Sequence, residues 1–79
     1  MLRIDTWDVR CFLVAASSRS FNAASKQLWV SQPTVTRAIS ALEEQFQVSL
    51  FERTSAGAVL TPAGELIRDY FAGKAEELE

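Results

Sequence analysis

Hydrophobic and polar positions in residues 31–46 follow the period of an amphipathic helix. One apolar stripe is formed by Val35, Ile39, Leu42 and Phe46. Ser31 is the predicted N-cap, and Pro33 lies in the first turn, where a missing N–H leaves no helical bond unmade. The opposite side carries Gln32, Thr36, Arg37 and Ser40. This polar helix start suits phosphate binding and hydrogen bonding to base edges in a major groove; an ordinary solvated surface helix is the alternative interpretation.

Two shorter helices are predicted before this one. Asp5 caps a helix over residues 6–17, in which apolar side chains recur at helical spacing. After a polar break, residues 22–28 form a short helix whose Ala23 and Ala24 allow a neighbouring helix to approach closely. Residues 29–31 connect it to the third helix, and we expect ordinary backbone regions there because the connection has no glycine. A short helix, a tight connection and a longer helix with a polar start are the helix-turn-helix pattern.

A hairpin and a last helix follow the predicted third helix. Residues 50–53 and 58–60 are predicted strands around a turn at 54–57, which extends the motif to a winged helix-turn-helix. Thr61 is the predicted N-cap of the last helix, Pro62 its first position, and Gly64 leaves room for another element in its first turn. Its apolar face consists of Ile67, Phe71 and Leu78. We expect this face to form a subunit contact; packing on the domain's own first helix is the alternative.

The predicted fold class is mainly α: a three-helix core, a two-stranded β wing and a C-terminal linker helix. Residues 1–61 form the winged helix-turn-helix domain and residues 62–79 the dimerisation helix. A chain of 79 residues makes one small domain that buries a modest fraction of its surface, so a partner subunit would help its stability.

Composition narrows the class of function. No apolar run reaches the roughly 20 residues of a membrane helix, and the N-terminus has no signal-peptide pattern, so we expect a soluble cytoplasmic protein. With no histidine and the single cysteine Cys11, the chain cannot assemble a Cys/His zinc site or a Ser-His-Asp unit. We therefore expect no enzymatic activity, no metal and no cofactor.

The charge distribution is uneven along the chain. A net charge of −2 and a pI near 5.1 weigh against nucleic-acid binding. However, residues 9–42 contain no acidic side chain and four basic ones, Arg10, Arg19, Lys26 and Arg37. Acidic residues are concentrated after residue 64. Because binding depends on the local field, the first half of the chain can still present a basic surface.

Four segments, FLVAA, SFNAASKQLWVSQPTVTRAISALEEQF, LFERT and LTPAGE, follow one another between about residues 7 and 71. Together they resemble the N-terminal DNA-binding domain of LysR-type transcriptional regulators. The resemblance implies a winged helix-turn-helix, double-stranded DNA as partner, and a homodimer formed through the linker helix. It also implies a separate C-terminal domain, outside this sequence, that senses a small-molecule effector.

The resemblance also assigns site residues. Base contacts would come from Gln32, Pro33, Thr34 and Thr36. Backbone contacts would come from Ser31, Arg37, Ser40, Asn22 and Arg53, with pairing to a nearby carboxylate as the alternative for Arg53. Two departures from the family pattern bear on affinity: residues 54–58 carry no charge where family wings usually have Arg or Lys, and Gln47 replaces a usual glycine. If that position needs φ > 0, glutamine costs roughly 1 kcal/mol.

The predicted function is sequence-specific DNA binding by the N-terminal domain of a bacterial regulator. A dimer would place two third helices, residues 31–46, in successive major grooves of an interrupted palindrome. The alternative is a winged-helix protein-interaction module without DNA binding, which the acidic pI and the neutral wing favour.

Overall fold

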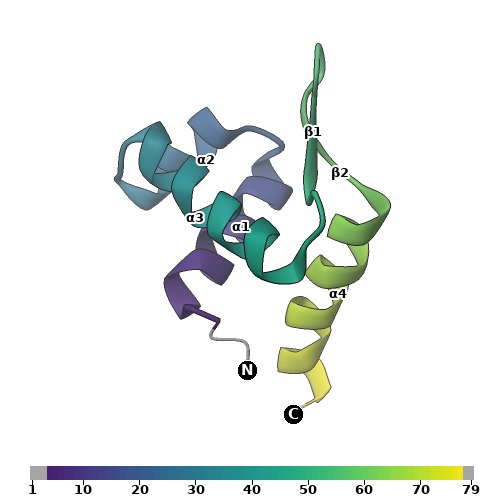
Figure 1. Cartoon of the computed structure of the whole chain (residues 1–79). Coiled ribbons are helices and arrows are strands. Elements are labelled where there is room, and N and C mark those ends of the chain that lie inside the picture. The colour runs from purple at the N-terminus through teal and green to yellow at the C-terminus, as the bar shows by residue number, and fades with distance from the viewer. Residues whose placement is uncertain (1–3, 78–79) are drawn as a thin grey trace.

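Four helices and one β-hairpin make up residues 4–77, the part of the chain that the computed structural model describes. Their order is α1 (Thr6–Ser18), α2 (Phe21–Leu28), α3 (Gln32–Phe46), β1 (Phe51–Thr54), β2 (Gly57–Leu60) and α4 (Pro62–Glu77) (Figure 1). The predicted mainly α, winged helix-turn-helix fold is confirmed. Within these residues, no helix has the length and apolar character needed to cross a membrane.

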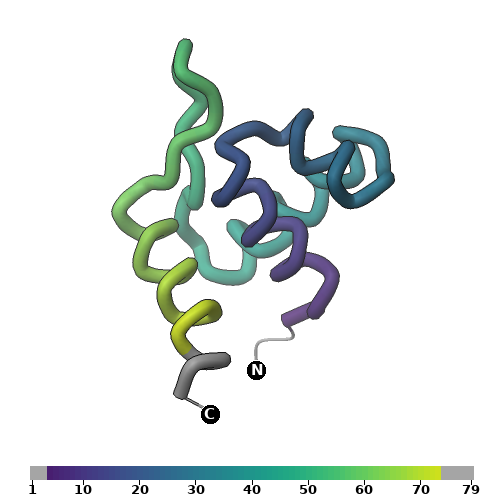
Figure 2. Tube along the Cα trace, turned by 180° about the vertical axis from the view of Figure 1, so that it is seen from behind, coloured from purple at the N-terminus to yellow at the C-terminus, as the bar shows by residue number. Residues whose placement is uncertain are grey.

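The hydrophobic core is organised around α1. Figure 2 shows α1 between α4 on one side and α2 on the other, and α1 also packs against α3. Its Cys11, Phe12 and Ala15 are fully buried. The predicted stripe of α3 faces this core, with Val35, Ile39 and Leu42 buried and Phe46 packed at the edge. Burial of this stripe fixes which side of α3 faces solvent.

Side-chain caps begin the helices. The predicted N-caps are confirmed: Asp5 accepts a hydrogen bond from the Trp7 N–H at 2.9 Å, Ser31 from Thr34 at 3.3 Å, and Thr61 from Gly64 at 2.9 Å. The sequence interpretation did not name a fourth cap, Ser20, which accepts from the Ala23 N–H at 3.0 Å and starts α2 one residue earlier than predicted.

Left-handed residues end three of the helices. Arg19, Trp29 and Gln47 have φ of 57°, 61° and 59°. The expectation that residues 29–31 turn in ordinary backbone regions is therefore wrong. The N–H groups of Trp29 and Val30 fold back onto carbonyls of α2, and this helix ending requires a left-handed residue even though no glycine is present. The positive φ considered for Gln47 is confirmed.

The hairpin stands out from the helices (Figure 1). Its antiparallel register pairs Phe51 with Leu60 and Thr54 with Gly57. The first strand is shifted by one residue from the predicted 50–53, and the second begins one residue before the predicted 58–60 and ends at the same residue. One residue from the pair that closes its turn, the Ala58 N–H donates to the Arg19 carbonyl at 3.1 Å. Gly57 has φ of 113°, and a Cβ there would lie 2.6 Å from the same carbonyl oxygen. The hairpin is thus fastened to the end of α1.

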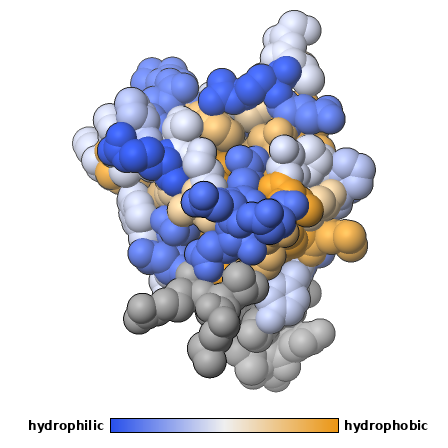
Figure 3. Space-filling view, viewed as in Figure 1, coloured by the Kyte–Doolittle hydropathy of each residue, from blue (hydrophilic) through white to orange (hydrophobic). Residues whose placement is uncertain are grey.

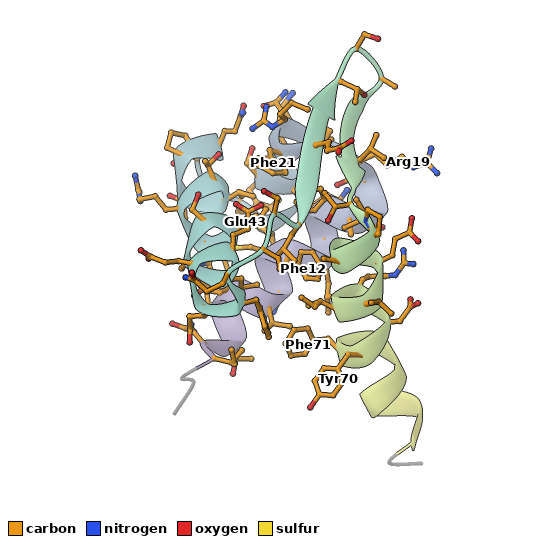
Figure 4. All side chains as sticks on the ribbon, turned by 45° about the vertical axis from the view of Figure 1, so that its right-hand side comes forward. Phe12, Arg19, Phe21, Glu43, Tyr70 and Phe71 are labelled. Atoms are coloured by element: carbon orange, nitrogen blue, oxygen red, sulfur yellow. The ribbon has the colours of Figure 1, made fainter. Side chains whose placement is uncertain are left out.

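Helix α4 packs on the domain through part of its apolar face. Phe71 points toward the other helices in Figure 4, and its ring centroid lies 6.4 Å from that of Phe46. Ile67 also packs against the core. For these two residues the structure shows packing within their own domain, while Leu78 lies outside the described residues. Among the side chains of α4 that the structure describes, the large exposed apolar ones are Leu66 and Tyr70, at 73% and 56% exposure. Dimerisation through α4 stays a prediction.

Candidate nucleic-acid interface

The N-terminal half of α3 presents a polar face to solvent. Gln32, Pro33, Arg37 and Ser40 are exposed, and Thr34 and Thr36 are half-buried. An open depression of about 420 Å³ is lined by Gln32, Pro33, Thr36 and Arg37. The structure therefore brings together three of the four predicted base-contact residues with one predicted phosphate-contact residue.

The first turn of α3 is held by its own side chains. The Ser31 hydroxyl accepts from the Thr34 N–H and lies 2.9 Å from the Thr34 hydroxyl in a second hydrogen bond. Pro33 restricts φ in the same turn. This part of the interface is consequently rigid, and the Ser31 hydroxyl is already used as a cap.

A second depression joins α3 to the hairpin. Its volume is about 190 Å³, and it is lined by Ser20, Phe21, Asn22, Gln32, Arg53, Thr54, Gly57 and Ala58. Three predicted site residues from three elements, Asn22, Gln32 and Arg53, meet there. Ser40 lies one turn beyond Arg37 on α3 and borders neither depression.

Arg53 stacks on an aromatic ring. Its Cζ lies 4.2 Å from the centroid of the Phe21 ring, close enough for a cation–π interaction. In the part of the chain that the structure describes, the ion pair is between Arg68 and Asp69, at 2.9 Å, so Arg53 has no carboxylate partner there. The carboxylate alternative for Arg53 is not realised. Sequence reasoning missed Phe21 as a neighbour of this site, because only the fold brings residues 21 and 53 together.

The surface over this region is predominantly hydrophilic. Figure 3 shows hydrophilic side chains over most of the visible face of α2 and α3, with hydrophobic ones gathered toward α4. Leu66 contributes to the exposed apolar surface of α4. The polar face of α3 and the apolar face of α4 are thus separate surfaces.

The described residues offer little support for a metal site or a reactive thiol. They contain no group of three or more His, Cys, Asp or Glu side chains placed to hold a metal ion. Burial, followed by the charge of Asp8, raises the pKa of the Cys11 thiol. The thiol therefore stays protonated at neutral pH, in keeping with a core residue.

The chain has close relatives among known proteins. A family model described as "Bacterial regulatory helix-turn-helix protein, lysR family" matches residues 7–65. The regulator TfdS of Cupriavidus pinatubonensis is 50% identical over 56 residues, which are 71% of this chain and 19% of TfdS. The chain thus spans about a fifth of the length of that relative.

Solved structures show the same domain fold. A crystal structure of the BenM DBD with catB site 1 DNA matches with a TM-score of 0.84 and 28% identity, over 94% of this chain and 83% of that one. The CbnR DBD–DNA complex matches with a TM-score of 0.78 and 33% identity, over 92% and 91%. The family match over residues 7–65 includes all the α2, α3 and hairpin residues that line the two depressions. The chain therefore belongs to the LysR family of bacterial regulatory helix-turn-helix proteins.

Proposed function

We propose that this chain is the DNA-binding part of a bacterial transcriptional regulator and that α3 enters the major groove of double-stranded DNA. The observation that carries this proposal is the exposed polar start of α3, on the side opposite the stripe that packs into the core. An amide, a hydroxyl and a guanidinium on that face match the donors and acceptors of base edges and phosphates. The BenM and CbnR structures, which are DNA complexes, support the same conclusion.

Base contacts come from the first turns of α3 in this proposal. The Gln32 amide can bond adenine at two positions, and Thr36 can bond a base edge through its hydroxyl. The Thr34 hydroxyl is bonded to Ser31, so we assign the Thr34 methyl group, with the ring of Pro33, to a thymine methyl. These four residues carry the sequence preference.

Backbone contacts surround this centre. Arg37 lies on the same depression and holds a phosphate, which positions α3 without reading sequence. Asn22 and Arg53 serve the same purpose from α2 and β1, and the exposed Ser40 does so farther along α3. Ser31 contributes less, because its hydroxyl caps the helix.

The neutral hairpin tip limits affinity. Residues 54–58 carry no charge, so they add no phosphate neutralisation and no minor-groove cation. We expect binding with a modest salt dependence, supplied mainly by Arg37 and Arg53.

We propose a homodimer formed through the linker helix, predicted as residues 62–79. Leu66 and Tyr70 supply the exposed apolar surface of the described part of this helix. Ile67 and Phe71 pack against the core and would hold α4 in the position that presents this surface to the partner. Two copies of α3 about one DNA turn apart then match an interrupted palindrome.

The remaining parts of such a regulator lie outside this chain. The chain spans about a fifth of TfdS, and we propose that a separate domain of the whole protein senses a small-molecule effector. A regulator of bacterial genes acts where the chromosome is, so we propose a cytoplasmic location.

Fluorescence anisotropy with a labelled duplex tests this function. The duplex carries an AT-rich interrupted dyad, a scrambled duplex serves as competitor, and the titrations are run over a series of salt concentrations. Arg37→Ala is compared with Arg10→Ala, which removes the same charge from an exposed position on α1. We expect saturable binding that prefers the dyad, with loss in Arg37→Ala and little change in Arg10→Ala.

The salt series gives a second criterion. Arg37→Ala should reduce the slope of log Kobs against log[salt] by about 0.9, the value for one phosphate contact. A folded domain that binds neither duplex at low salt, also when it is tested within the full-length regulator, would favour the protein-interaction module instead.

A further inference from the structure

Three aromatic rings connect the core to Arg53. The ring centroids of Phe12 and Phe51 are 5.7 Å apart, and those of Phe51 and Phe21 are 5.1 Å apart, both in edge-to-face arrangements. The guanidinium of Arg53 then lies over the Phe21 ring at 4.2 Å. Figure 4 shows Phe12 in the middle of the fold and Phe21 nearer the hairpin. The result is a continuous row of contacting side chains from the buried centre to the surface.

The two ends of this row of rings differ in burial, and Phe51, between Phe12 and Phe21, is half-buried. Phe12 is 0% exposed and Phe21 is 7% exposed, whereas Arg53 is exposed. A buried ring has a fixed orientation, so the face of the Phe21 ring defines one position for the guanidinium. A guanidinium has five N–H donors, and those that do not face the Phe21 ring stay available for an acceptor at the N–H edge.

The surroundings of that N–H edge favour an anionic acceptor. Arg53 borders the 190 Å³ depression together with Asn22 and Gln32, and none of the described side chains that line it is acidic. The neighbouring Glu52 is paired with Val59, and alternation along a strand directs it to the opposite face. Arg53 is also the one cation in residues 51–60. The hairpin's contribution to phosphate binding therefore depends on this single side chain.

We infer that Phe21 is a positioning residue for DNA binding: its ring holds the Arg53 guanidinium at the depression between α2 and the hairpin, where it meets a DNA phosphate. The inference rests on the proposed function and adds to it a residue that does not itself contact DNA. An unstacked Arg53 on an exposed strand would have to be ordered at the moment of binding, and the stack removes part of that cost.

A purely structural role of Phe21 predicts a different pattern. Phe21 packs against Phe51, so its truncation also weakens the domain. Such weakening lowers DNA affinity to the same extent whether or not residue 53 is an arginine. A double-mutant cycle between Phe21→Leu and Arg53→Gln separates the two roles.

The cycle is measured by anisotropy with the dyad duplex over a salt series, on variants shown to be folded by circular dichroism. Arg53→Gln should reduce the salt slope by about 0.9. Phe21→Leu should weaken binding about two- to fivefold when Arg53 is present, the fold-change expected for an exposed cation–π pair. In the Arg53→Gln background it should have almost no effect. Phe21→Tyr keeps the aromatic face and should bind like the wild type.

Each outcome decides the inference. Equal losses from Phe21→Leu in both backgrounds, or loss of binding in folded Phe21→Tyr, would overturn it while leaving DNA binding intact. A wild-type protein that does not bind the dyad at all would overturn the proposed function, and the inference with it.

A measurement on the free protein covers the case in which Phe21→Leu does not fold. Side-chain protons of Arg53 that lie over the Phe21 ring should be shifted upfield by its ring current in NMR spectra of the wild type. Unshifted Arg53 protons would overturn the inference without any DNA titration.

Discussion

The two glycines of α4 should respond to alanine substitution with opposite signs. A Cβ on Gly64 would overlap the Leu50 carbonyl oxygen and would come within 3.0 Å of the Leu60 Cδ2 atom. Among the atoms that the structure describes, a Cβ on Gly73 would meet none within 4 Å. Both positions are helical, so alanine gains up to about 1 kcal/mol of helix propensity at each. The clash therefore decides the difference between them.

The cost at Gly64 can be estimated from what must move. The Leu50 carbonyl accepts from the Thr61 N–H at 3.0 Å, and the Thr61 hydroxyl donates to the Ser49 carbonyl; shifting α4 away weakens both bonds. Each such hydrogen bond contributes about 1 kcal/mol, and forcing an extra methyl into a packed site costs about 1–3 kcal/mol. After the propensity gain, we expect Gly64→Ala to lose about 2–4 kcal/mol of the free energy of unfolding, a large part of the total for a domain of this size.

Thermal unfolding followed by circular dichroism at 222 nm measures both variants. For a domain of this size 1 kcal/mol corresponds to about 4–8 °C, so Gly64→Ala should lower Tm by about 10 °C or more. Gly73→Ala should raise it by a few degrees. A Gly64→Ala variant that melts at or above the wild-type temperature would refute the close approach of α4 to Leu50, and equal shifts of the same sign would refute the contrast.

Three further substitutions probe local features. Glu43→Ala removes the carboxylate that accepts from the Leu50 N–H at 2.8 Å, and urea unfolding should show a loss of about 1–3 kcal/mol; an unchanged midpoint would contradict this role. Trp29→Asn replaces a 92% exposed side chain at φ 61° with a residue that tolerates this region, and should gain up to about 1 kcal/mol; a loss would mean that the indole makes a stabilising contact. Burial, and then Asp5, raise the pKa of Asp8 above its ordinary 3.8. Because the folded pKa is the higher one, the stability that this carboxyl contributes is present below the unfolded pKa and is lost as pH rises through the folded pKa. Asp8→Asn should therefore be more stable than wild type at pH 7 and equal to it at pH 3, as read from unfolding at both pH values.

Periodicity and capping chemistry predicted the parts of the fold that depend on local sequence. The apolar stripe of α3 determines which face is buried, and the polar face with Gln32 and Arg37 follows from it. Ser31 and Thr61 mark helix starts because a hydroxyl there satisfies a free backbone N–H. These signals lie within a few residues of the features they predict.

Features that depend on contacts between distant residues were not predictable in this way. The sequence around Trp29 does not indicate a positive φ, because the left-handed conformation is required by the way α2 ends before α3. The position of the Arg53 guanidinium depends on Phe21, which lies on α2, whereas Arg53 lies on β1. Ile67 and Phe71 of α4 were predicted to lie at a subunit contact, with packing inside the domain as the alternative. Both pack against the core, and the position of α4 on the core decides this.

One short segment around Leu50 sets how the hairpin, α3 and α4 are positioned relative to one another. Its side chain is 0% exposed, its N–H donates to Glu43 of α3, and its carbonyl accepts from Thr61 at the start of α4. Because β1 begins at the next residue, these bonds set where the hairpin leaves the domain. Arg53 lies three residues farther on and reaches Phe21 only if that exit direction is kept. Substitutions at Glu43 or Gly64 should consequently affect the placement of Arg53 as well as stability, although neither residue lines the depressions at the interface.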